Sequence, residues 1–416
     1  MSAHSAVVIV GSGQAGGRAA EGLRQGGHTG RITLIGAEVH APYERPSLSK
    51  EFLASAAAER LAWVRPSTWY ADAGITVLSG VQAVGIDTAR SVVELDQGAP
   101  VEYETLILTT GARPRPLPVP GATHPRVSYL RTIDDSRRLQ QQLLPGARVV
   151  VVGAGFIGME VTATAVARGC TVTVLELTEL PMARVLPAQL GAFYAAFHGG
   201  QGVDLRMSTG VRGIDDYRGR PVIHTDSGQT ILADVVVVGI GVIPNVELAQ
   251  SAGLEIDDGI VVDEYGRTGD SRIYAAGDVT SHYNPLMDCR VRLESWQNAQ
   301  NQAIAVARNV LGADRPYAEV PWLWSDQYGL NLQIAGLPRS GDEIVRRSVP
   351  NGEPGLYFHL REGRLVAVLG VDSARDVRFG KEIIAMRGSP AAADLADASM
   401  PLATLYAAAK RSAQAA

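Results

Sequence analysis

The feature that most constrains the fold is a duplicated run of four β-branched residues that leads into a glycine-rich turn. Residues 7–10 (Val-Val-Ile-Val) precede Gly-Ser-Gly-Gln-Ala-Gly at 11–16, and residues 149–152 (four valines) precede Gly-Ala-Gly-Phe-Ile-Gly at 153–158. A short, continuous apolar run of this kind is typical of a strand that is buried on both faces. Each turn opens into a helix-like stretch rich in alanine, valine and leucine.

A second apolar strand follows each predicted helix, at residues 32–35 and 171–175. Two such strands joined through a helix form a βαβ unit, whose strands run parallel. The sequence therefore predicts two βαβ units, each in a parallel sheet covered on both faces. Two further apolar strands are predicted at 106–108 and 235–238. Each is followed by glycine and then by proline, which indicates that the strand ends there and the chain leaves the sheet.

The G-x-G-x-x-G spacing has a specific physical basis in dinucleotide binding. The first glycine makes the turn, the second lets the backbone approach a pyrophosphate, and the third lets helix and strand pack closely. The pyrophosphate then lies on the helix N-terminus, where free N–H groups and the dipole attract anions. A lone motif is weak, because a strand-to-helix turn needs glycine for its own geometry, but the duplication favours dinucleotide contacts at Gly11, Gly13, Gly16, Gly153, Gly155, Ile157 and Gly158.

Two such sites in one chain suggest one tightly held flavin and one exchanging nicotinamide. Glu176 follows the second strand directly, 18 residues after Gly158, where a carboxylate accepts from the adenosine ribose and repels a 2′-phosphate. The alternative is a solvated charge at a strand end. Residues 177–179 offer no arginine for a phosphate, so we expect NADH to be preferred over NADPH. In the first unit the acidic candidate is Glu38, which follows Gly36-Ala37.

A short apolar run ends in Gly277-Asp278, and we expect a helix to begin directly after it. Asp278 is then either the N-cap of that helix or a carboxylate that accepts from a ribityl hydroxyl of FAD. The flavin interpretation agrees with the two dinucleotide units, and we favour it.

The remaining organisation follows from composition along the chain. A proline-rich run at 114–120 reads as a linker, so the second repeat is predicted to be inserted into the first domain, which resumes after Pro244. A third zone begins near Pro316, with strand-like runs and an alanine-rich helix, and is predicted to be a small α+β domain. Its runs are residues 332–334, 344–346, 357–360, 365–369 and the helix at 402–410. We expect an FAD-binding domain at 1–114 and 242–318, an NAD-binding domain at 115–241 and a C-terminal domain at 319–416.

Composition excludes several classes of protein. The 38 basic and 43 acidic residues give a net charge of −5, without the concentrated basic face of a nucleic-acid-binding protein. Two cysteines in 416 residues exclude a disulfide framework, and the eight histidines show no metal-ligand spacing. No apolar run approaches the ~20 residues of a membrane helix. Residues 1–5 lack the features of a secretory signal, so we expect a soluble, cytoplasmic enzyme with no metal, nucleic acid or membrane partner.

Several motifs of the chain resemble those of a known family, the FAD-dependent ferredoxin reductases of the putidaredoxin, rhodocoxin and biphenyl-dioxygenase type. These belong to the wider two-dinucleotide-fold flavoproteins that include glutathione reductase. The resemblance spans nearly the whole chain. Its motifs are residues 11–16, 42–50, 109–114, 129–132, 155–160, 276–278, 294–299 and 321–327. It implies an α/β fold with two Rossmann-like dinucleotide-binding domains and a small C-terminal α+β domain.

The resemblance also assigns residues to the cofactors. It implies FAD contacts at Gly13, Ala15, Lys50, Ala83, Arg131, Asp278 and Trp296. Lys50 is the candidate cation near flavin N5, and Glu160 is expected near both the nicotinamide and Lys50, as an ion pair or an acceptor for the amide. Two departures matter. Ser47 stands where the family commonly has proline, and Ala37 where some relatives have aspartate, which passes ribose recognition to Glu38.

The implied reaction is transfer of a hydride from NADH to FAD, followed by single-electron transfer to an iron–sulfur ferredoxin, expected to be of the [2Fe-2S] type. That ferredoxin would serve a cytochrome P450 or a ring-hydroxylating dioxygenase. Trp296, Trp322 and Trp324 are candidates to line the flavin and the edge of the site that faces the ferredoxin. A basic docking rim is suggested for Arg290, Arg292, Arg308 and Arg339. We expect a monomer or weak homodimer.

Two other functions stay open. One is an NADH oxidase or diaphorase that passes electrons to oxygen or quinones. The other is a redox sensor resembling apoptosis-inducing factor. The disulfide reductases of the group are disfavoured, because they carry redox cysteines in the flavin domain and this chain has none before Cys170.

Overall fold

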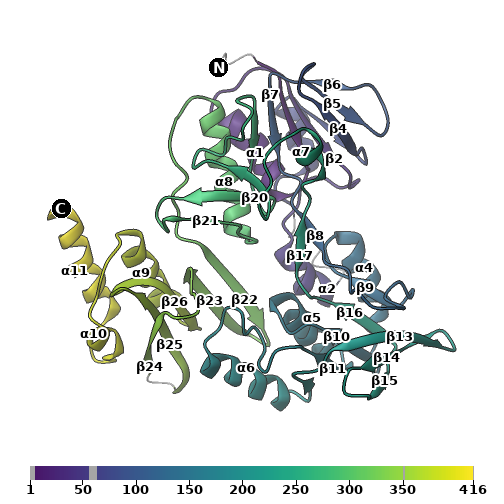
Figure 1. The fold of residues 1–416 in the computed structure, drawn as a ribbon, viewed down its shortest axis with the longest axis vertical. Coiled ribbons are helices and arrows are strands. Elements are labelled where there is room, and N and C mark those ends of the chain that lie inside the picture. The colour runs from purple at the N-terminus through teal and green to yellow at the C-terminus, as the bar shows by residue number, and fades with distance from the viewer. Residues whose placement is uncertain (1–4, 56–62, 350–351, 416) are drawn as a thin grey trace. The chain divides into compact units, whose positions relative to one another are not determined.

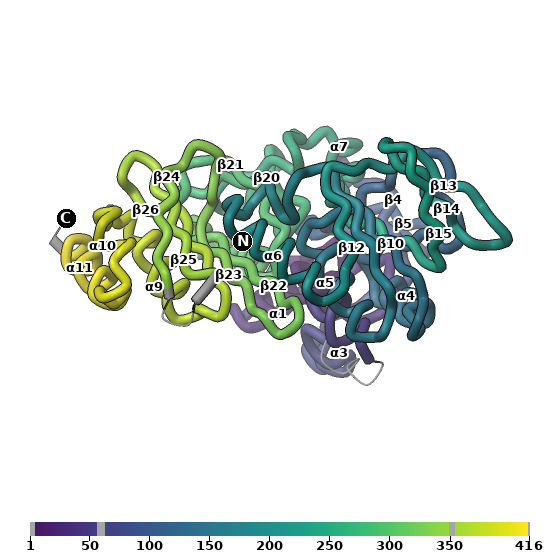
Figure 2. The backbone as a smooth tube through the Cα atoms, turned by 90° about the horizontal axis from the view of Figure 1, so that it is seen from below, coloured from purple at the N-terminus to yellow at the C-terminus, as the bar shows by residue number. Residues whose placement is uncertain are grey.

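The computed structural model describes residues 5–55, 63–349 and 352–415 (Figures 1 and 2). Residues 1–4, which carry part of the argument against a secretory signal, lie outside this description. Two units divide the chain. Unit 1 comprises Met1–Arg45, Arg60–Arg113 and Ile243–Pro321, and unit 2 comprises Pro46–Glu59, Pro114–Val242 and Trp322–Ala416.

Unit 1 is built on a five-stranded parallel sheet in the order β19-β7-β1-β2-β3. The strands are β1 (Val7–Val10), β2 (Ile32–Gly36), β3 (Ile75–Ser79), β7 (Thr105–Leu108) and β19 (Ile273–Ala275). Helix α1 (Gln14–Gln25) connects β1 to β2, which confirms the first predicted βαβ unit. It packs closely against α8 (Trp296–Val310), because a Cβ at Gly22 would lie 3.0 Å from Ala307 Cβ.

The rest of unit 1 consists of two small sheets and two short helices. They are β4 (Ala83–Asp87), β5 (Val92–Leu95) and β6 (Val101–Glu102); β18 (Ile260–Val262), β20 (Thr280–Asn284) and β21 (Cys289–Val291); and α3 (Ser67–Asp72) and α7 (Glu247–Ser251). The helix expected directly after Asp278 is wrong. Strand β20 follows instead, because it pairs with β18 on one side and β21 on the other.

Unit 2 repeats the parallel arrangement, in the order β12-β11-β10-β16-β9. The strands are β9 (Val127–Tyr129), β10 (Arg148–Val152), β11 (Thr171–Leu175), β12 (Asp204–Arg206) and β16 (Val235–Val238), with helices α4 (Ile133–Gln142), α5 (Phe156–Ala167) and α6 (Ala188–Gly200). Helix α5 connects β10 to β11, which confirms the second predicted βαβ unit. An antiparallel sheet of β13 (Val211–Tyr217), β14 (Arg220–Thr225) and β15 (Thr230–Leu232) lies beyond β12 in the chain (Figure 2).

Unit 2 also contains a five-stranded antiparallel sheet, in the order β22-β23-β26-β25-β24 (Figure 1). Its strands are β22 (Trp322–Gln327), β23 (Leu330–Gly336), β24 (Glu343–Val349), β25 (Gly352–Arg361) and β26 (Arg364–Val371), followed by α9 (Ala374–Ala385), α10 (Ala392–Ala396) and α11 (Leu402–Ala415). The four predicted strands and the terminal helix are confirmed. The sequence analysis missed β22 as a strand and α9 as a helix.

The chain passes between the units through β8 (Ala112–Pro114) and β17 (Val242–Pro244), which pair as a two-stranded sheet. Among the described residues no helix is both long and apolar enough to cross a membrane. Within the same ranges, no group of three or more histidine, cysteine, aspartate or glutamate residues could hold a metal ion.

The segment Pro46–Glu59 is assigned to unit 2, and its described residues, 46–55, contain the 3-10 turn η1 (Pro46–Ser49) and helix α2 (Glu51–Ala54). Helices α4 and α5 hold its backbone. The Gln140 amide donates to Phe52 O (2.8 Å) and the Thr164 hydroxyl to Ser49 O (2.8 Å). The guanidinium of Arg168 donates to Ala54 O (2.8 Å) and also to carbonyls of Leu143 and Gln140 at 2.9 Å each. These bonds fix the position of Lys50.

We expect Arg168→Met to lower the free energy of unfolding by about 2 kcal/mol, because four backbone carbonyls, the fourth being Leu53 O at 3.4 Å, lose a charged donor. Arg137→Met is the matched control, since Arg137 forms a surface pair with Asp134 on the same unit and such pairs contribute less than about 0.5 kcal/mol. Guanidinium chloride unfolding followed by circular dichroism measures both. Equal unfolding midpoints for the two variants would contradict the anchoring role of Arg168.

Candidate functional site

The glycine loop of unit 1 contains glycines of two different kinds. Gly11 has a φ of +110°, and a Cβ there would lie 2.2 Å from Thr109 O. A Cβ on Gly16 would lie 1.9 Å from Gly11 O. Gly13, in contrast, has a φ of −78°, and its Cβ would meet only Arg45 Nη2, at 3.7 Å. The chain therefore requires glycine at the first and third positions, whereas at the second position glycine only leaves open space.

The loop of unit 2 shows the same pattern. Gly153 has a φ of +101°, and its Cβ would lie 2.5 Å from Gly239 O, while a Cβ on Gly158 would lie 2.0 Å from Gly153 O. Gly155 has a φ of −75°, and its nearest neighbour would be Gly239 O at 4.0 Å. The side chain of Ile157 is 48% exposed.

The N-cap residue is Gly13 in α1 and Gly155 in α5. Glycine has no side chain, so neither helix has a side-chain acceptor from its N-cap residue. Helix N-terminal N–H groups without a side-chain acceptor attract anions. The open second glycine and the uncapped helix N-terminus together fit a pyrophosphate at each loop. The residues present therefore fit two dinucleotides.

In unit 1 the acidic candidates converge on Arg45. Its guanidinium lies 2.8 Å from Glu38 Oε1 and stacks over the ring of Tyr43, whose hydroxyl also donates to Glu38. Burial works against the charge of Arg45, but Tyr43, Glu38 and Asp278 outweigh it and the pKa of the guanidinium is raised. The sequence analysis named Glu38 and Asp278 but missed Arg45, although it lies inside the quoted motif at 42–50.

Other predicted flavin residues of unit 1 lie on the elements around this loop. Trp296 begins α8, and its carbonyl accepts from the Gln14 amide of α1 at 3.3 Å. Ala83 is buried at the start of β4, and Ala37 is exposed after β2. In unit 2, the backbone N–H of Arg131 donates to Asp135 Oδ2 (3.1 Å), directly before α4.

Glu176 has acceptor bonds within unit 2 itself. Its Oε2 accepts from the Ala154 N–H (2.6 Å), inside the glycine loop, and its Oε1 accepts from the Thr178 N–H (2.9 Å) and hydroxyl (3.1 Å). The carboxylate therefore ties the loop to the segment after β11. A carboxylate has about four acceptor positions, so it retains capacity for a ribose hydroxyl.

Glu160 and Lys50 form a buried ion pair in unit 2. The Lys50 ammonium lies 2.8 Å from Glu160 Oε2, and the Glu160 side chain is 3% exposed. The predicted pairing of these two residues is confirmed, while their catalytic role stays a prediction. Two serines complete the environment of the carboxylate. Ser49 Oγ donates to Oε2 (2.5 Å) and Ser325 Oγ donates to Oε1 (2.7 Å). Sequence analysis missed both serines, although the quoted motifs contain them.

Four of the residues proposed for the partner edge and the docking rim have intramolecular partners. Trp322 and Trp324 stack with ring centroids 5.1 Å apart, and their indole N–H groups donate to Gln333 and Asp326. Arg290 donates to the Val262 and Ser281 carbonyls, and Arg292 pairs with Asp258 and Glu294. Arg290 and Arg292 are therefore weak candidates for a docking rim.

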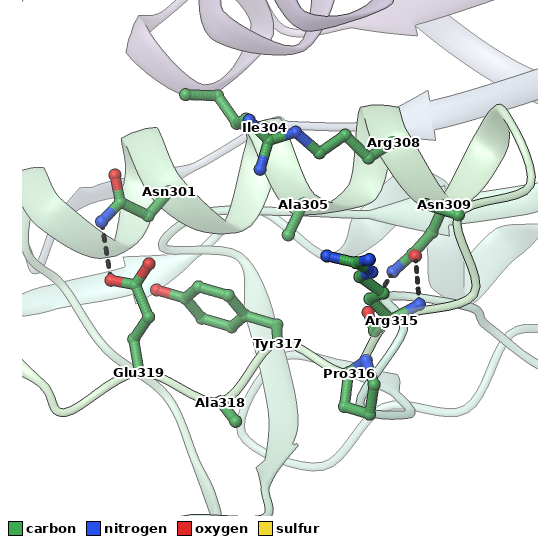
Figure 3. Close-up of a pocket in the computed structure, with 11 residues that line it drawn as sticks. Asn301, Ile304, Ala305, Arg308, Asn309, Arg315, Pro316, Tyr317, Ala318 and Glu319 are labelled. Atoms are coloured by element: carbon green, nitrogen blue, oxygen red, sulfur yellow. Dashed lines mark hydrogen bonds between the residues drawn. The ribbon is translucent and has the colours of Figure 1, made fainter. Parts of the chain in front are cut away.

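A cavity of about 420 Å³ lies in unit 1 between α8 and the segment before Pro321 (Figure 3). The Asn301 amide donates to Glu319 Oε2 (2.6 Å), and Figure 3 shows the Tyr317 hydroxyl directed toward the Glu319 side. Arg308 is the one lining residue that the sequence analysis singled out. The glycine loops contribute nothing to the lining, so this cavity is not the dinucleotide site.

Comparison with known proteins agrees with this geometry. The model of the pyridine nucleotide-disulphide oxidoreductase family matches residues 5–303, and the model of the reductase C-terminal family matches residues 322–406.

Individual relatives match along nearly the whole chain. The ferredoxin–NAD(+) reductase component of the anthranilate 1,2-dioxygenase system of Burkholderia cepacia is 45% identical, over 95% of this chain and 98% of that protein. Rhodocoxin reductase of Rhodococcus erythropolis is 45% identical, over 91% and 89%. The crystal structure of the covalent putidaredoxin reductase–putidaredoxin complex gives a TM-score of 0.94 at 38% identity, over 98% of this chain and 99% of that chain.

The two kinds of glycine should separate folding from binding. We expect Gly158→Ala to lower the unfolding free energy by about 3 kcal/mol, because its Cβ collides with backbone. Gly155→Ala should change it by less than about 0.5 kcal/mol but weaken NAD⁺ binding at least tenfold, because the methyl group enters the open space at the α5 N-terminus. Chemical unfolding and equilibrium NAD⁺ titration measure the two effects. Unchanged NAD⁺ affinity in Gly155→Ala would refute a pyrophosphate at this loop.

Proposed function

Because the chain belongs to the pyridine nucleotide-disulphide oxidoreductase family and matches its ferredoxin–NAD reductases along nearly its whole length, we propose that it is an FAD-dependent NADH:ferredoxin oxidoreductase. It oxidises NADH and passes single electrons to an iron–sulfur ferredoxin that serves a cytochrome P450 or a ring-hydroxylating dioxygenase. The observation that carries the proposal is the pair of glycine loops, one in each unit, whose second glycine opens onto an uncapped helix N-terminus.

FAD is assigned to the loop of unit 1. Gly13 and Ala15 would lie along the pyrophosphate, Ala83 on the adenine side, and Asp278 and Trp296 toward the ribityl chain and ring. The ion pair of Arg45 with Glu38 supports this assignment, because it holds that carboxylate beside the loop for a ribose hydroxyl. Lys50 and Arg131, for which the family resemblance implies FAD contacts, belong to unit 2, and their contacts with FAD stay predictions. When bound, FAD supplies the change from two-electron oxidation of NADH to one-electron reduction of a ferredoxin.

NADH is assigned to the loop of unit 2. The N–H groups at the start of α5 bind its pyrophosphate, and Glu176 accepts from its ribose. Because Glu176 already accepts from Ala154 and Thr178, its carboxylate is held in one orientation. A fixed negative charge at that place repels a 2′-phosphate, which supports a preference for NADH over NADPH.

The catalytic pair is assigned to Lys50 and Glu160. Both lie in unit 2, Lys50 directly after η1 and Glu160 on α5, and the Lys50 ammonium lies 2.8 Å from Glu160 Oε2 in a buried environment. Lys50 supplies a positive charge for an electron-rich cofactor, and Glu160 orients that charge and offers an acceptor to the nicotinamide amide. Hydride transfer between two cofactors depends on their placement more than on acid–base chemistry, so these residues act chiefly by orientation.

Disulfide chemistry is disfavoured despite the family's name. The chain has two cysteines, Cys170 in unit 2 and Cys289 in unit 1, and they form no disulfide in the structure. Burial raises the pKa of Cys170, which disfavours the thiolate that disulfide exchange needs.

The proposal also covers the electron acceptor, the oligomeric state and the domain boundaries. The electron acceptor is proposed to be a [2Fe-2S] ferredoxin, and the enzyme a monomer or weak homodimer. The chain is proposed to divide into the FAD-binding domain at 1–114 and 242–318, the NAD-binding domain at 115–241 and the C-terminal domain at 319–416. Structural support for the last division is the separate antiparallel sheet of β22 to β26.

The decisive measurement is stopped-flow reduction of the purified protein at 450 nm, first by NADH and then by NADPH, followed by addition of a [2Fe-2S] ferredoxin. We expect NADH to reduce the flavin at least tenfold faster than NADPH at equal subsaturating concentrations, and the ferredoxin to reoxidise it. Reoxidation by oxygen or quinone alone would replace this function with that of an NADH oxidase.

Glu176→Gln should raise the KM for NADH about tenfold and narrow the preference over NADPH, because glutamine offers one acceptor atom where the loop uses two. The turnover number should change less than twofold, since Lys50 and Glu160 are untouched. Glu179→Gln is the matched control, an exposed glutamate three residues on, and should leave both constants within twofold. Steady-state kinetics with both nucleotides test the prediction, and equal effects of the two variants would contradict it.

A further inference from the structure

A chain of buried hydrogen bonds ends on the Glu160 carboxylate and is unused by the function proposed so far. His198 of α6 bonds to Gln327 of β22 (Nε2 to Oε1, 2.8 Å), and the Gln327 amide donates to Ser325 Oγ (3.1 Å). Ser325 in turn donates to Glu160 Oε1 (2.7 Å). All four side chains are buried, and all four belong to unit 2.

The chemistry of the partners gives each bond in this chain its direction. A carboxylate oxygen only accepts, so the single hydroxyl hydrogen of Ser325 is donated to Glu160, and Ser325 Oγ accepts from the amide nitrogen of Gln327. The amide oxygen of Gln327 therefore faces His198. An amide oxygen only accepts, so His198 Nε2 carries a hydrogen. Burial lowers the pKa of His198, which keeps the ring neutral, and its Nδ1 has no hydrogen-bond partner among the described residues.

Every donor therefore points toward Glu160. His198 donates to Gln327, Gln327 to Ser325 and Ser325 to the carboxylate, while Ser49 and Lys50 donate to the other carboxylate oxygen. A chain with an amide at its centre is a poor proton conductor, because the amide nitrogen would have to give up and regain a proton. Consistent orientation instead strengthens each bond and fixes the acceptor at the end.

We propose that Ser325 is a positioning residue for Glu160, and that Gln327 and His198 hold its hydroxyl in the donating orientation. Without this hydroxyl, Oε1 would be a buried carboxylate oxygen without a donor, which is costly, and the carboxylate would rotate away from its contacts with Ser49 and Lys50. Ser325 and Gln327 lie on β22 of the antiparallel sheet, so that sheet sets the geometry of the pair formed by η1 and α5. This inference rests on the proposed role of Lys50 and Glu160.

The test is a double-mutant cycle between Ser325→Ala and Glu160→Ala in the flavin-containing protein. We expect Ser325→Ala to slow the limiting rate of single-turnover reduction by NADH about tenfold when Glu160 is present and less than twofold when it is absent. The NADH concentration at half-maximal rate should stay within twofold, because the glycine loop and Glu176 are untouched. Gln327→Leu should act in the same direction, about threefold, and also only in the presence of Glu160.

Thr225→Ala is the matched control. Thr225 is a buried residue of β14 in unit 2 whose hydroxyl also donates a hydrogen bond, to Gln229 O at 3.3 Å in the turn between β14 and β15, but not to the carboxylate. We expect its effect on the limiting rate to be the same with and without Glu160. The same cycle, measured by chemical unfolding of these proteins, should show coupling between positions 325 and 160 and none between 225 and 160.

The outcomes distinguish this inference from the proposed function. If NADH reduces the unmodified protein but the effects of Ser325→Ala and Glu160→Ala are additive in rate and unfolding, the positioning role is refuted and the function stands. If NADH fails to reduce the unmodified protein, the proposed function is refuted. Coupling between positions 325 and 160 that is seen in unfolding but not in the reduction rate would make Ser325 only a structural partner of Glu160, and this result also overturns the positioning role.

Discussion

The buried carboxylate of Glu160 is the interaction on which much of unit 2 depends. A buried charge is tolerated only when it is paired and its remaining acceptor positions are satisfied. Here the ammonium of Lys50 and two serine hydroxyls supply those partners, from η1 and from β22. Segments that are far apart in the sequence must therefore reach the same point on α5. Losing Lys50 would leave the charge unpaired, and losing β22 would leave Oε1 without the Ser325 donor.

This requirement explains why the segment Pro46–Glu59 folds with unit 2 although the chain on both sides of it belongs to unit 1. Its backbone is held by Gln140, Thr164 and Arg168, which lie on or at the ends of α4 and α5. Lys50 is thereby tied to the unit whose glycine loop is proposed for NADH, while the loop proposed for FAD belongs to the other unit.

Sequence patterns predicted the parts of this protein that depend on local periodicity and failed where long-range contacts decide. Both βαβ units and four of the C-terminal strands follow from apolar runs and glycine spacing. Strand β20 was expected to be a helix, because the pairing with β18 and β21 that determines it is not visible in the local pattern. Similarly, Ser325 was passed over beside two tryptophans, since a serine gains its meaning only from the carboxylate that it contacts, 165 residues away in the chain.

The same distinction applies to the glycines, which a motif treats as equivalent. Gly16 and Gly158 are glycine because their own backbone leaves no room for a Cβ. Gly13 and Gly155 have ordinary backbone angles and open space in front of them, so nothing in the folded chain requires glycine there. Glycine at a position where the folded chain would accept a side chain is best explained by a bound ligand that needs the space. The second glycine of each loop is therefore the structure's own argument for two bound dinucleotides, independent of any relative.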